Sequence, residues 1–519
     1  MGKAVSQRVH QTASTMSSHT SGRTGCHATP ARMVALSIAG EIRRRKGYAR
    51  DVLRTSQELR GMDARDVSFV QRLVLGVTLS SGLLDEFIDT HAIRPSNIQP
   101  QVRDALRIAC YELCYLQTPA NTAVNQGVEL VRSVVFRAAG MANAILRRVA
   151  VQDVSRVAAA HQIVQAACTS DQLQTEALTA APHPTVQDFA LTMAAPVWLV
   201  QQLIDSIGVQ ALCDMALCAH EPAPVWVSAN SGIHTFEEVR NLLDAAGVIV
   251  QDAPFPQVWC VQNAALLTSS KLVKQADVVV SDLAARMVCY SASPEPDTTL
   301  LEIGQGRATK SMLLESLAQQ AGAPVQLVGV DNSPFKVAVA QRRLEKGWGA
   351  YCQSVAYDAG SLDNPTQLPE PLRRNFDLVF VDAPCSGTGT MRRHPEIAWT
   401  LTPEALMSTS AHSIPATQLR ILVSAASRVQ KGGTLVYSTC SVMRQENEDV
   451  VTAFLQTDIG HHFGLVSVLD APAVCALKDQ SLQAYELLAN CVTDEGMFRS
   501  HPKMGSFDGH FCARFVRCA

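Results

Sequence analysis

Residues 299–310 read Thr-Leu-Leu-Glu-Ile-Gly-Gln-Gly-Arg-Ala-Thr-Lys, and this stretch decides the fold of the C-terminal half of the chain. The short apolar run that ends at Ile303 is typical of a buried strand. Gly304 and Gly306 follow at once, and they permit a tight turn that a ligand can approach closely. The stretch therefore predicts a strand that passes through a glycine loop into a helix.

Similar apolar runs alternate with helical segments over residues 282–519, and the clearest lie at 326–330, 378–381 and 434–437. This alternation predicts a mostly parallel, doubly wound α/β sheet, which binds its ligands at the carboxyl ends of its strands. Asp331 ends the second strand, where a carboxylate can accept hydrogen bonds from ribose hydroxyls. Asp358 follows a predicted third strand and is placed to meet an adenine ring or its amine.

Two cysteines each come just after a predicted strand of this sheet. Cys385 lies in Val381–Thr390 (VDAPCSGTGT), and Cys440 lies in Tyr437–Ser441 (YSTCS). A free cysteine is more often a small buried hydrophobic residue than a nucleophile. Two cysteines at the same edge of one sheet instead predict a reactive pair.

The longer stretches around these cysteines closely resemble the RNA 5-methylcytosine methyltransferases, and the matching residues are Asp382–Gly389, Arg392–Glu396, Ser438–Ser441 and Glu446–Glu448. The resemblance implies that Cys440 is the nucleophile and that Cys385 assists product release. It also implies that Asp382 holds the cytosine edge, because a carboxylate can accept a hydrogen bond from the exocyclic amine. DNA cytosine methyltransferases use the cysteine of a Pro-Cys motif and lack the second cysteine. The presence of both Pro384-Cys385 and Thr439-Cys440 favours RNA.

The chemistry explains why a thiol is needed. Carbon 5 of cytosine is too weak a nucleophile to attack a sulfonium methyl group. A thiolate that adds to carbon 6 turns the ring into an enamine, and a base must later remove the proton from carbon 5 so that the thiolate can leave. Because a cysteine is only a few per cent thiolate at neutral pH, the site is expected to favour the anion.

The glycine loop resembles class I methyltransferases, which implies S-adenosylmethionine as cofactor. The implied cofactor-binding residues are Glu302, Gly304, Gly306, Lys310, Asp331, Asp358 and Asp382. RNA cytosine methyltransferases usually carry a loop of the type D-x-C-A-A-P-G-G-K-T. Lys310 keeps the lysine of that loop, but the Ala-Pro-Gly-Gly run is replaced by an E-x-G-x-G form. This departure leaves the contacts to the methionine side of the cofactor open.

Residues 31–150 are predicted to be helical, because apolar residues from Val102 to Leu116 recur at spacings of four and three. This segment resembles the NusB-type domain, a small helical RNA-binding fold, in the stretches 66–77, 106–113, 123–130 and 142–147. The resemblance implies contact with RNA; the alternative is a helical spacer. The basic run Arg43–Lys46 is either a solvated face or a phosphate contact. Cys110 and Cys114 are expected to pack in the core.

The remaining divisions are a disordered tail at 1–30, a linker at 151–181, a small α/β domain at 182–281 and the methyltransferase domain at 282–519. In the family that this chain resembles, a small α/β domain precedes the catalytic one. The formal net charge is −3, so RNA contact must come from local basic patches. Arg392 and Arg393 are expected to meet phosphates; the alternative is an exposed pair without a partner.

The composition suits a folded chain, with 47% apolar and 18% charged residues. Neither a secretory signal nor a run of about 20 apolar residues is present, which favours a cytoplasmic protein that does not use a membrane. Fifteen cysteines without paired C-x-x-C motifs favour reduced thiols and argue against a structural metal. A monomer is compatible with the sequence.

The joining of a NusB-type domain to this catalytic domain resembles the bacterial small-subunit ribosomal RNA cytosine-5 methyltransferases. The expected substrate is one cytosine exposed in a loop or in partly folded ribosomal RNA, because the target carbon must leave any base stack. Two alternatives stay open. The same chemistry can act on transfer RNA or another ribosomal site, or the chain is an inactive RNA-binding or assembly protein, for which the altered glycine loop is the only support.

Overall fold

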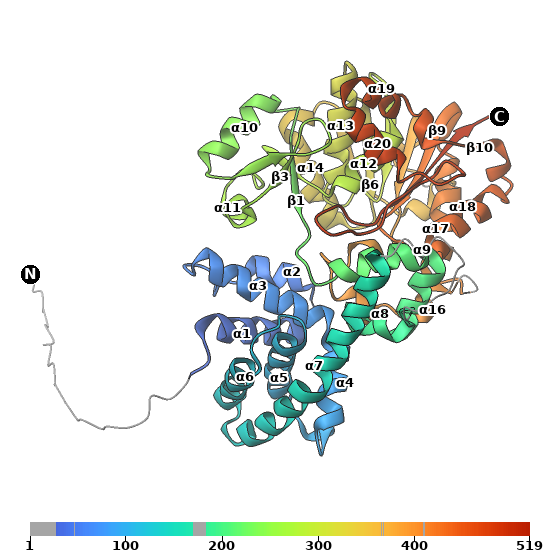
Figure 1. The fold of residues 1–519 in the computed structure, drawn as a ribbon. Helices are drawn as coiled ribbons and strands as arrows, with labels where there is room; N and C mark the ends of the chain where they lie inside the picture. The colour runs from blue at the N-terminus through green and yellow to red at the C-terminus, as the bar shows by residue number, and fades with distance from the viewer. Residues whose placement is uncertain are drawn as a thin grey trace, which may run out of the picture.

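The computed structural model describes residues 27–45, 47–169, 183–364, 366, 368–407 and 410–518. Figure 1 shows a helical N-terminal part, a small domain with an antiparallel sheet, and a larger domain built on a mixed, mostly parallel sheet. This is the fold class that the sequence predicts. Most of the expected N-terminal tail, residues 1–26, lies outside the described residues.

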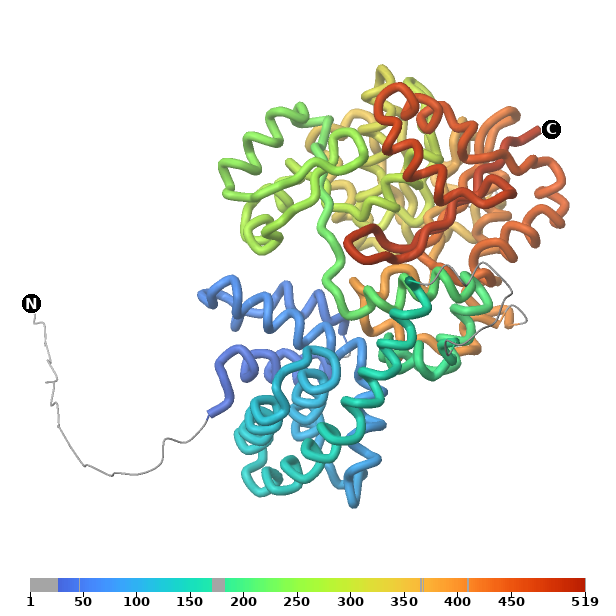
Figure 2. The backbone as a smooth tube through the Cα atoms, in the orientation of Figure 1, coloured from blue at the N-terminus to red at the C-terminus, as the bar shows by residue number. Residues whose placement is uncertain are grey.

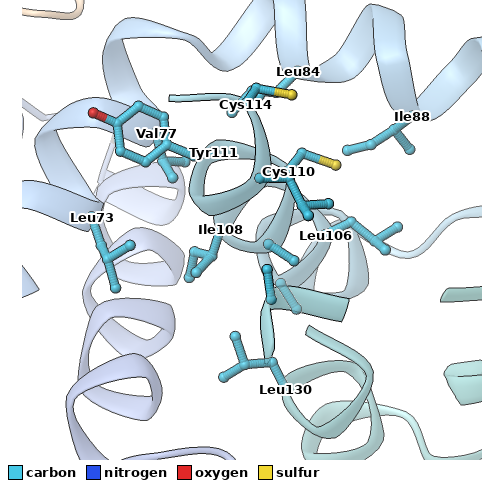
Figure 3. Close-up of a cluster of buried hydrophobic side chains, with 14 of the residues drawn as sticks. Leu73, Val77, Leu84, Ile88, Leu106, Ile108, Cys110, Tyr111, Cys114 and Leu130 are labelled. Atoms are coloured by element: carbon cyan, nitrogen blue, oxygen red, sulfur yellow. The ribbon is translucent and has the colours of Figure 1, made fainter. Parts of the chain in front are cut away.

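The helical part packs around one central helix. Its α-helices are α1 (Pro30–Arg45), α2 (Ala49–Thr55), α3 (Ala64–Leu79), α4 (Ser81–His91), α5 (Pro100–Cys114), α6 (Ala120–Val134) and α7 (Ala139–Thr169). Figure 3 shows side chains of α3 and α4 directed toward Leu106, Ile108 and Cys110 of α5. Cys110 and Cys114 are buried here, which confirms the predicted core packing, and burial raises the pKa of both thiols.

Helix α7 differs from the expected linker, because it continues well beyond residue 150 and ends at Thr169. Val157 and Ala160 are buried in the helical core, and Val164 packs in a second cluster with α8 (Val186–Met193) and α9 (Val197–Cys218). Apolar burial on both sides thus keeps this segment helical. The rest of the expected linker, residues 170–181, lies outside the described residues.

Helices α8 and α9 connect the helical part to the larger domain (Figure 2). Their cluster includes Met391, Ala398 and Val442, which come from the catalytic domain. Over the described ranges, no single helix is long and apolar enough to cross a bilayer, although two sharply bent pairs, α3 with α4 and α8 with α9, meet the length and composition criteria together.

The small domain has a four-stranded antiparallel sheet in the order β2-β3-β1-β4. Its elements are β1 (Val225–Ala229), α10 (Phe236–Ala245), β2 (Val250–Asp252), β3 (Val258–Val261), α11 (Ala264–Ser269) and β4 (Val278–Val280). Thr235 and Glu238 form a capping box that fixes the start of α10. Strand β2 begins only at Val250, because Gly247, with φ +70°, still belongs to the turn that ends α10.

The catalytic sheet runs in the order β10-β12-β9-β8-β5-β6-β7, and β11 pairs with β12. Its strands are β5 (Thr299–Ile303), β6 (Gln326–Asp331), β7 (Cys352–Ala356), β8 (Phe376–Asp382), β9 (Val429–Thr439), β10 (Phe463–Val466), β11 (Phe498–Arg499) and β12 (Phe511–Arg517). Pairing from β7 through β9 is parallel, and β12 joins β9 antiparallel. The predicted parallel strands are therefore confirmed.

Helices cover both faces of this sheet, so its central strands are apolar on both sides. The helices concerned include α12 (Leu283–Ala292), α13 (Thr309–Ala321), α14 (Pro334–Trp348), α17 (Ile414–Ala426), α18 (Glu448–Leu455), α19 (Pro472–Gln480) and α20 (Leu482–Ala489). Leu300 packs in the core of one face and Leu301 in the core of the other. This arrangement leaves the carboxyl ends of the strands to carry polar groups.

The contact between α3 and α5 predicts how the helical part responds to one added methyl group. A Cβ at Gly76 would lie 1.9 Å from the ring of Tyr111. We expect Gly76→Ala to lower the free energy of unfolding by about 1–3 kcal/mol, because overpacking forces the helices apart. Thermal unfolding followed by circular dichroism measures the change.

Gly140→Ala in α7 is the matched control, because its added Cβ meets nothing within 4 Å. Alanine there is expected to stabilise the helix by up to about 1 kcal/mol. Equal midpoints for the two variants would show that α3 and α5 do not pack as closely as described.

Candidate active site

Two thiols meet at the carboxyl edge of the catalytic sheet. Strand β8 ends at Asp382 and β9 ends at Thr439, and the loops that follow carry Cys385 and Cys440. The two Sγ atoms lie 3.1 Å apart, and both residues are partly exposed. The predicted pair of cysteines is thus brought together in the structure.

The environment of the pair keeps Cys385 protonated. Its pKa is raised well above the ordinary value, first by the hydrogen bond with Cys440 and then by burial of the thiol. A thiol in this state is a poor nucleophile, because the thiolate is the attacking species.

A carboxylate connects the two thiol-bearing loops. Glu446 is fully buried and accepts hydrogen bonds from Ser386, which follows Cys385, and from Ser441, which follows Cys440. Burial raises the pKa of Glu446, and these donors lower it in part. The sequence places Glu446 inside a motif but gives it no role, because its partners lie up to 60 residues away.

An ion pair stands beside the thiols. Lys310 Nζ, from the first turn of α13, lies 2.7 Å from Asp382 Oδ2. Burial alone would lower the pKa of Lys310, but the charge of Asp382 outweighs it and raises that pKa. Asp382 Oδ1 has no hydrogen-bond partner within the described residues, so it can accept from a ligand. The sequence predicts both residues at the site, and the structure places them together.

A buried histidine that the sequence analysis passes over lies near this ion pair. His510 immediately precedes β12, whose first residue, Phe511, pairs with Thr439 beside Cys440. Burial lowers the pKa of His510 to about 4, and the charge of Lys310 adds to this effect. The imidazole is therefore neutral near pH 7. A lone histidine at a strand start carries no sequence signal for such a position.

The glycine loop fits a nucleoside-containing cofactor. Gly304 has φ +78°, and a Cβ there would lie 2.1 Å from the carbonyl oxygen of Asp382. The amide of Gly306 donates to Asp331 Oδ2 at 3.1 Å, so the acidic end of β6 also anchors the loop. These features leave backbone and carboxylate, rather than side-chain bulk, at the edge where ligands bind in such folds.

Gln305 accounts for the unusual loop sequence. Its buried side chain packs against β6 at Gly329, where a Cβ would lie 2.0 Å from Nε2 of Gln305. Nε2 of Gln305 also donates to Ser311 at 3.2 Å. The side chain of Gln305 therefore supports the altered loop by packing against β6, where Gly329 leaves room for it.

The other two predicted cofactor residues lie apart from this loop surface. Glu302 is buried, and its carboxyl accepts from Ser311, with a pKa raised by burial to about 8. Asp358 is exposed, caps a short turn at Gly360, and lies 3.6 Å from Arg420. The structure thus ties Glu302 to the first turns of α13 and leaves Asp358 accessible.

Arg392 and Arg393 are placed differently from the expected phosphate contacts. Arg392 is buried and pairs with Asp508 at 3.0 Å, and Arg393 pairs with Asp508 and with Asp282, at 2.8 Å for the latter. Arg392 also donates to backbone carbonyls near the C-terminus. Both guanidinium groups are occupied, so the geometry does not support phosphate binding by either. Nor are they an exposed pair without a partner.

The segment that carries Cys385 also contacts the helical part. Trp399 donates to the carbonyl of Leu79, and its ring covers Gly82 so closely that a Cβ there would lie 2.1 Å away. Arg50 of α2 donates to the carbonyls of Arg392 and Arg393. The helical part therefore packs against the segment 392–399, which follows the Cys385 loop.

Comparison with known proteins agrees with this arrangement. Residues 290–516 match the family described as 16S rRNA methyltransferase RsmB/F, and residues 29–151 match the NusB family. The "Probable ribosomal RNA small subunit methyltransferase B" of Bacillus subtilis is 24% identical over 430 residues, which cover 82% of this chain and 88% of that protein. The Salmonella typhi ribosomal RNA small subunit methyltransferase B is 25% identical over 398 residues, with 76% and 82% covered.

Among solved structures, the crystal structure of PH0851 aligns with a TM-score of 0.67 at 20% identity, covering 94% of this chain and 99% of that one. This likeness shows the shared fold. The sheet, the glycine loop and the paired thiols define an S-adenosylmethionine-dependent methyltransferase of the RNA cytosine-5 class. The chain carries an RsmB/F methyltransferase domain joined to a NusB domain, and it is a distant homologue of the bacterial small-subunit methyltransferases B.

The geometry of the glycine loop predicts the effect of removing Asp331. Its carboxylate is expected to accept from the ribose hydroxyls, and it already accepts from the amides of Gly306 and Ser333. We expect Asp331→Ala to weaken S-adenosylmethionine binding by about 1.5–3 kcal/mol, the range for hydrogen bonds to a charged group. Isothermal titration calorimetry measures the affinity.

Asp252→Ala, in the small domain, is the control, because Asp252 is exposed and pairs only with Arg240 among the described residues. Its cofactor affinity is expected to equal that of the unaltered protein. If Asp331→Ala also binds with unchanged affinity, Asp331 does not belong to the cofactor site.

Proposed function

We propose that the protein transfers a methyl group from S-adenosylmethionine to carbon 5 of a cytosine in small-subunit ribosomal RNA, through a covalent adduct with Cys440. The observation that carries this proposal is the pair of Sγ atoms 3.1 Å apart beside the ion pair of Asp382 and Lys310. Two thiols and a carboxylate at one sheet edge match the needs of cytosine activation.

The resemblance to the RNA 5-methylcytosine methyltransferases assigns the attack to Cys440, and the raised pKa of Cys385 is consistent with it. A nucleophile that adds to carbon 6 has to be a thiolate, and Cys385 is held as a thiol by its neighbour and by burial. Asp382 Oδ1 accepts from the exocyclic amine of the cytosine, while Lys310 holds Oδ2. These contacts orient the cytosine ring and stabilise the charge that develops on it when the thiolate adds to carbon 6.

Cys385 acts after methyl transfer. The largest cause of its raised pKa is the hydrogen bond with Cys440, and that bond is lost once Cys440 Sγ is bonded to carbon 6. Once Cys385 has released its own proton to solvent, its thiolate takes the proton from carbon 5. The electron pair of that C–H bond restores the ring double bond and expels Cys440 as a thiolate.

The cofactor supplies an electrophilic methyl group when it is bound. Gly304 and Gly306 would allow it to approach the backbone, Asp331 would accept from its ribose hydroxyls, and the exposed Asp358 would be the residue that meets its adenine. Lys310 and Glu302 support the loop, because Lys310 donates to Asp382 and Glu302 accepts from Ser311 in the first turns of α13. These residues bind and orient; none of them carries the methyl group.

Ribosomal RNA is the favoured substrate because the relatives with the same two domains are named for it. The helical part supports this choice, since its NusB family match implies RNA contact and Arg44 and Arg147 are exposed on it. The protein is proposed to act as a monomer in the cytoplasm. An inactive assembly factor is disfavoured, because Asp382, Lys310 and both cysteines are arranged together.

The RNA target is tested by mapping 5-methylcytosine in ribosomal and transfer RNA from cells with and without the gene for this chain. When the gene is absent, one small-subunit cytosine is expected to lose its methyl group. That cytosine is expected to lie where it can unstack, because the enzyme must take its target base out of the stack to reach it. Return of the mark with the unaltered gene, but not with Cys440→Ala, is the control. Loss confined to transfer RNA would contradict the proposed target and leave the chemistry intact.

The two cysteines are predicted to behave differently on a denaturing gel with RNA and cofactor. Cys440→Ala should abolish methylation and give no covalent adduct, because the attacking thiol is absent. Cys385→Ala should accumulate a slow-migrating adduct, because attack and transfer proceed but the release of the ring is impaired.

Cys475→Ala serves as the control, since Cys475 is exposed and remote from the thiol pair in the fold. It should turn over normally and give no adduct. The reverse pattern for the two active-site variants would exchange the roles of Cys440 and Cys385. Normal turnover in both would end the covalent mechanism for this chain.

A further inference from the structure

We infer that Glu446 and Asn447 are positioning residues that set the separation of the two active-site thiols. The inference rests on the proposed function, and it concerns residues that touch neither the reacting thiols nor the expected ligands. The geometry behind it is a bridge of hydrogen bonds between the loop after β8 and the loop after β9.

The carboxylate of Glu446 joins the two loops directly. Its Oε1 accepts from the Ser386 amide at 2.7 Å, and its Oε2 accepts from the Ser386 hydroxyl at 2.5 Å. The hydroxyl of Ser441 also donates to Oε2. Ser386 and Ser441 are the residues that directly follow Cys385 and Cys440. One buried group therefore restrains both loops within one residue of each thiol.

The hydroxyls of the two loops complete the bridge. Ser386 Oγ and Thr388 Oγ1 lie 3.2 Å and 3.0 Å from Ser441 Oγ. Gln418 of α17 adds a bond of 3.2 Å to Glu446 and one of 3.0 Å to the carbonyl of Pro384, which precedes Cys385. The Cys385 loop is thus fixed on both sides of its thiol.

Asn447 fixes the second thiol in the same way. Its Oδ1 accepts from Thr439 Oγ1 at 2.6 Å, and its Nδ2 donates to the carbonyl of Ser441 at 2.9 Å. These are the residues on either side of Cys440. The side chain is fully buried, so water does not compete for these bonds.

A carboxylate suits this position because every neighbour donates to it. An ionised carboxyl group only accepts, whereas a glutamine also brings two N–H donors. Glutamine has nearly the same shape as glutamate, but Glu446→Gln would turn an N–H donor toward groups that are themselves donors in the structure. These groups are the hydroxyls of Ser386 and Ser441 and the amide of Ser386. The loops would keep their fold and lose their register at the thiols.

A crosslinking assay reads the thiol separation without RNA or cofactor. The full-length protein is treated with diamide, which oxidises two neighbouring thiols to a disulfide, and the Cys385–Cys440 peptide is quantified over time by mass spectrometry. We expect Glu446→Gln to slow this crosslink by about tenfold or more, because thiols that drift apart meet less often. Glu448→Gln is the matched control, since Glu448 pairs with Arg499 instead.

Single-turnover methylation is measured on the same variants. Glu446→Gln is expected to lower the rate at saturating RNA by about a hundredfold, the order of loss for a displacement of about 1 Å, with RNA affinity unchanged. Glu448→Gln is expected to match the unaltered protein in both assays. Should Glu446→Gln fail to fold by circular dichroism, Ser441→Ala, which removes one donor of the bridge, is judged by the same two measurements.

A slow crosslink together with slow transfer supports the positioning role. A normal crosslink, or a slow crosslink with normal transfer, overturns it. Failure of the proposed function is seen separately: Cys440→Ala would then still methylate RNA, whereas the crosslink contains no substrate and depends only on the thiol separation.

Discussion

The buried carboxylate of Glu446 is the group on which the catalytic edge depends. Moving a charge out of water costs several kcal/mol, and the cost is met only when hydrogen bonds satisfy its lone pairs. Here the donors come from both thiol-bearing loops and from α17. The loops cannot separate without leaving a buried charge short of partners. The same bonds that stabilise the carboxylate therefore keep the two thiols in contact.

Strand register makes this bridge available. Asp382 of β8 pairs with Ser438 of β9, so the residues that follow each strand start from adjacent positions. The loop before β12 then closes the site from the other side. The amide of Gly509 donates to the carbonyl of Gly389, and a Cβ on Gly389 would lie 2.1 Å from the carbonyl oxygen of Gly509. Backbone fit on one side and the carboxylate bridge on the other leave the thiol loops little freedom.

Much of the fold follows from local patterns, whereas the partners of individual side chains do not. Apolar runs revealed the parallel strands, and the two cysteines and Asp382 could be placed at the sheet edge because each follows such a run. Asp508, the partner of Arg392, lies 116 residues further along the chain. No local pattern indicates that pairing, so the acidic partners of the two arginines predicted as phosphate contacts could not be foreseen. The full length of α7 was not predicted for the same reason, since the surfaces that bury Val164 come from α8 and α9.

The segment that holds Arg392 and Arg393 joins parts of the protein that lie far apart in the sequence. Arg50 of the helical part donates to the carbonyls of both arginines, and Arg393 pairs with Asp282, which caps the start of α12. Trp399, in the same segment as Cys385, packs against α3 and α4. The helical part and the segment 392–399, which follows the Cys385 loop, are therefore joined by hydrogen bonds to backbone carbonyls in both directions: Arg50 donates to the segment, and Trp399 of the segment donates to Leu79. Because each partner comes from a different part of the chain, the position of this segment depends on the packing of the helices as well as on the sheet.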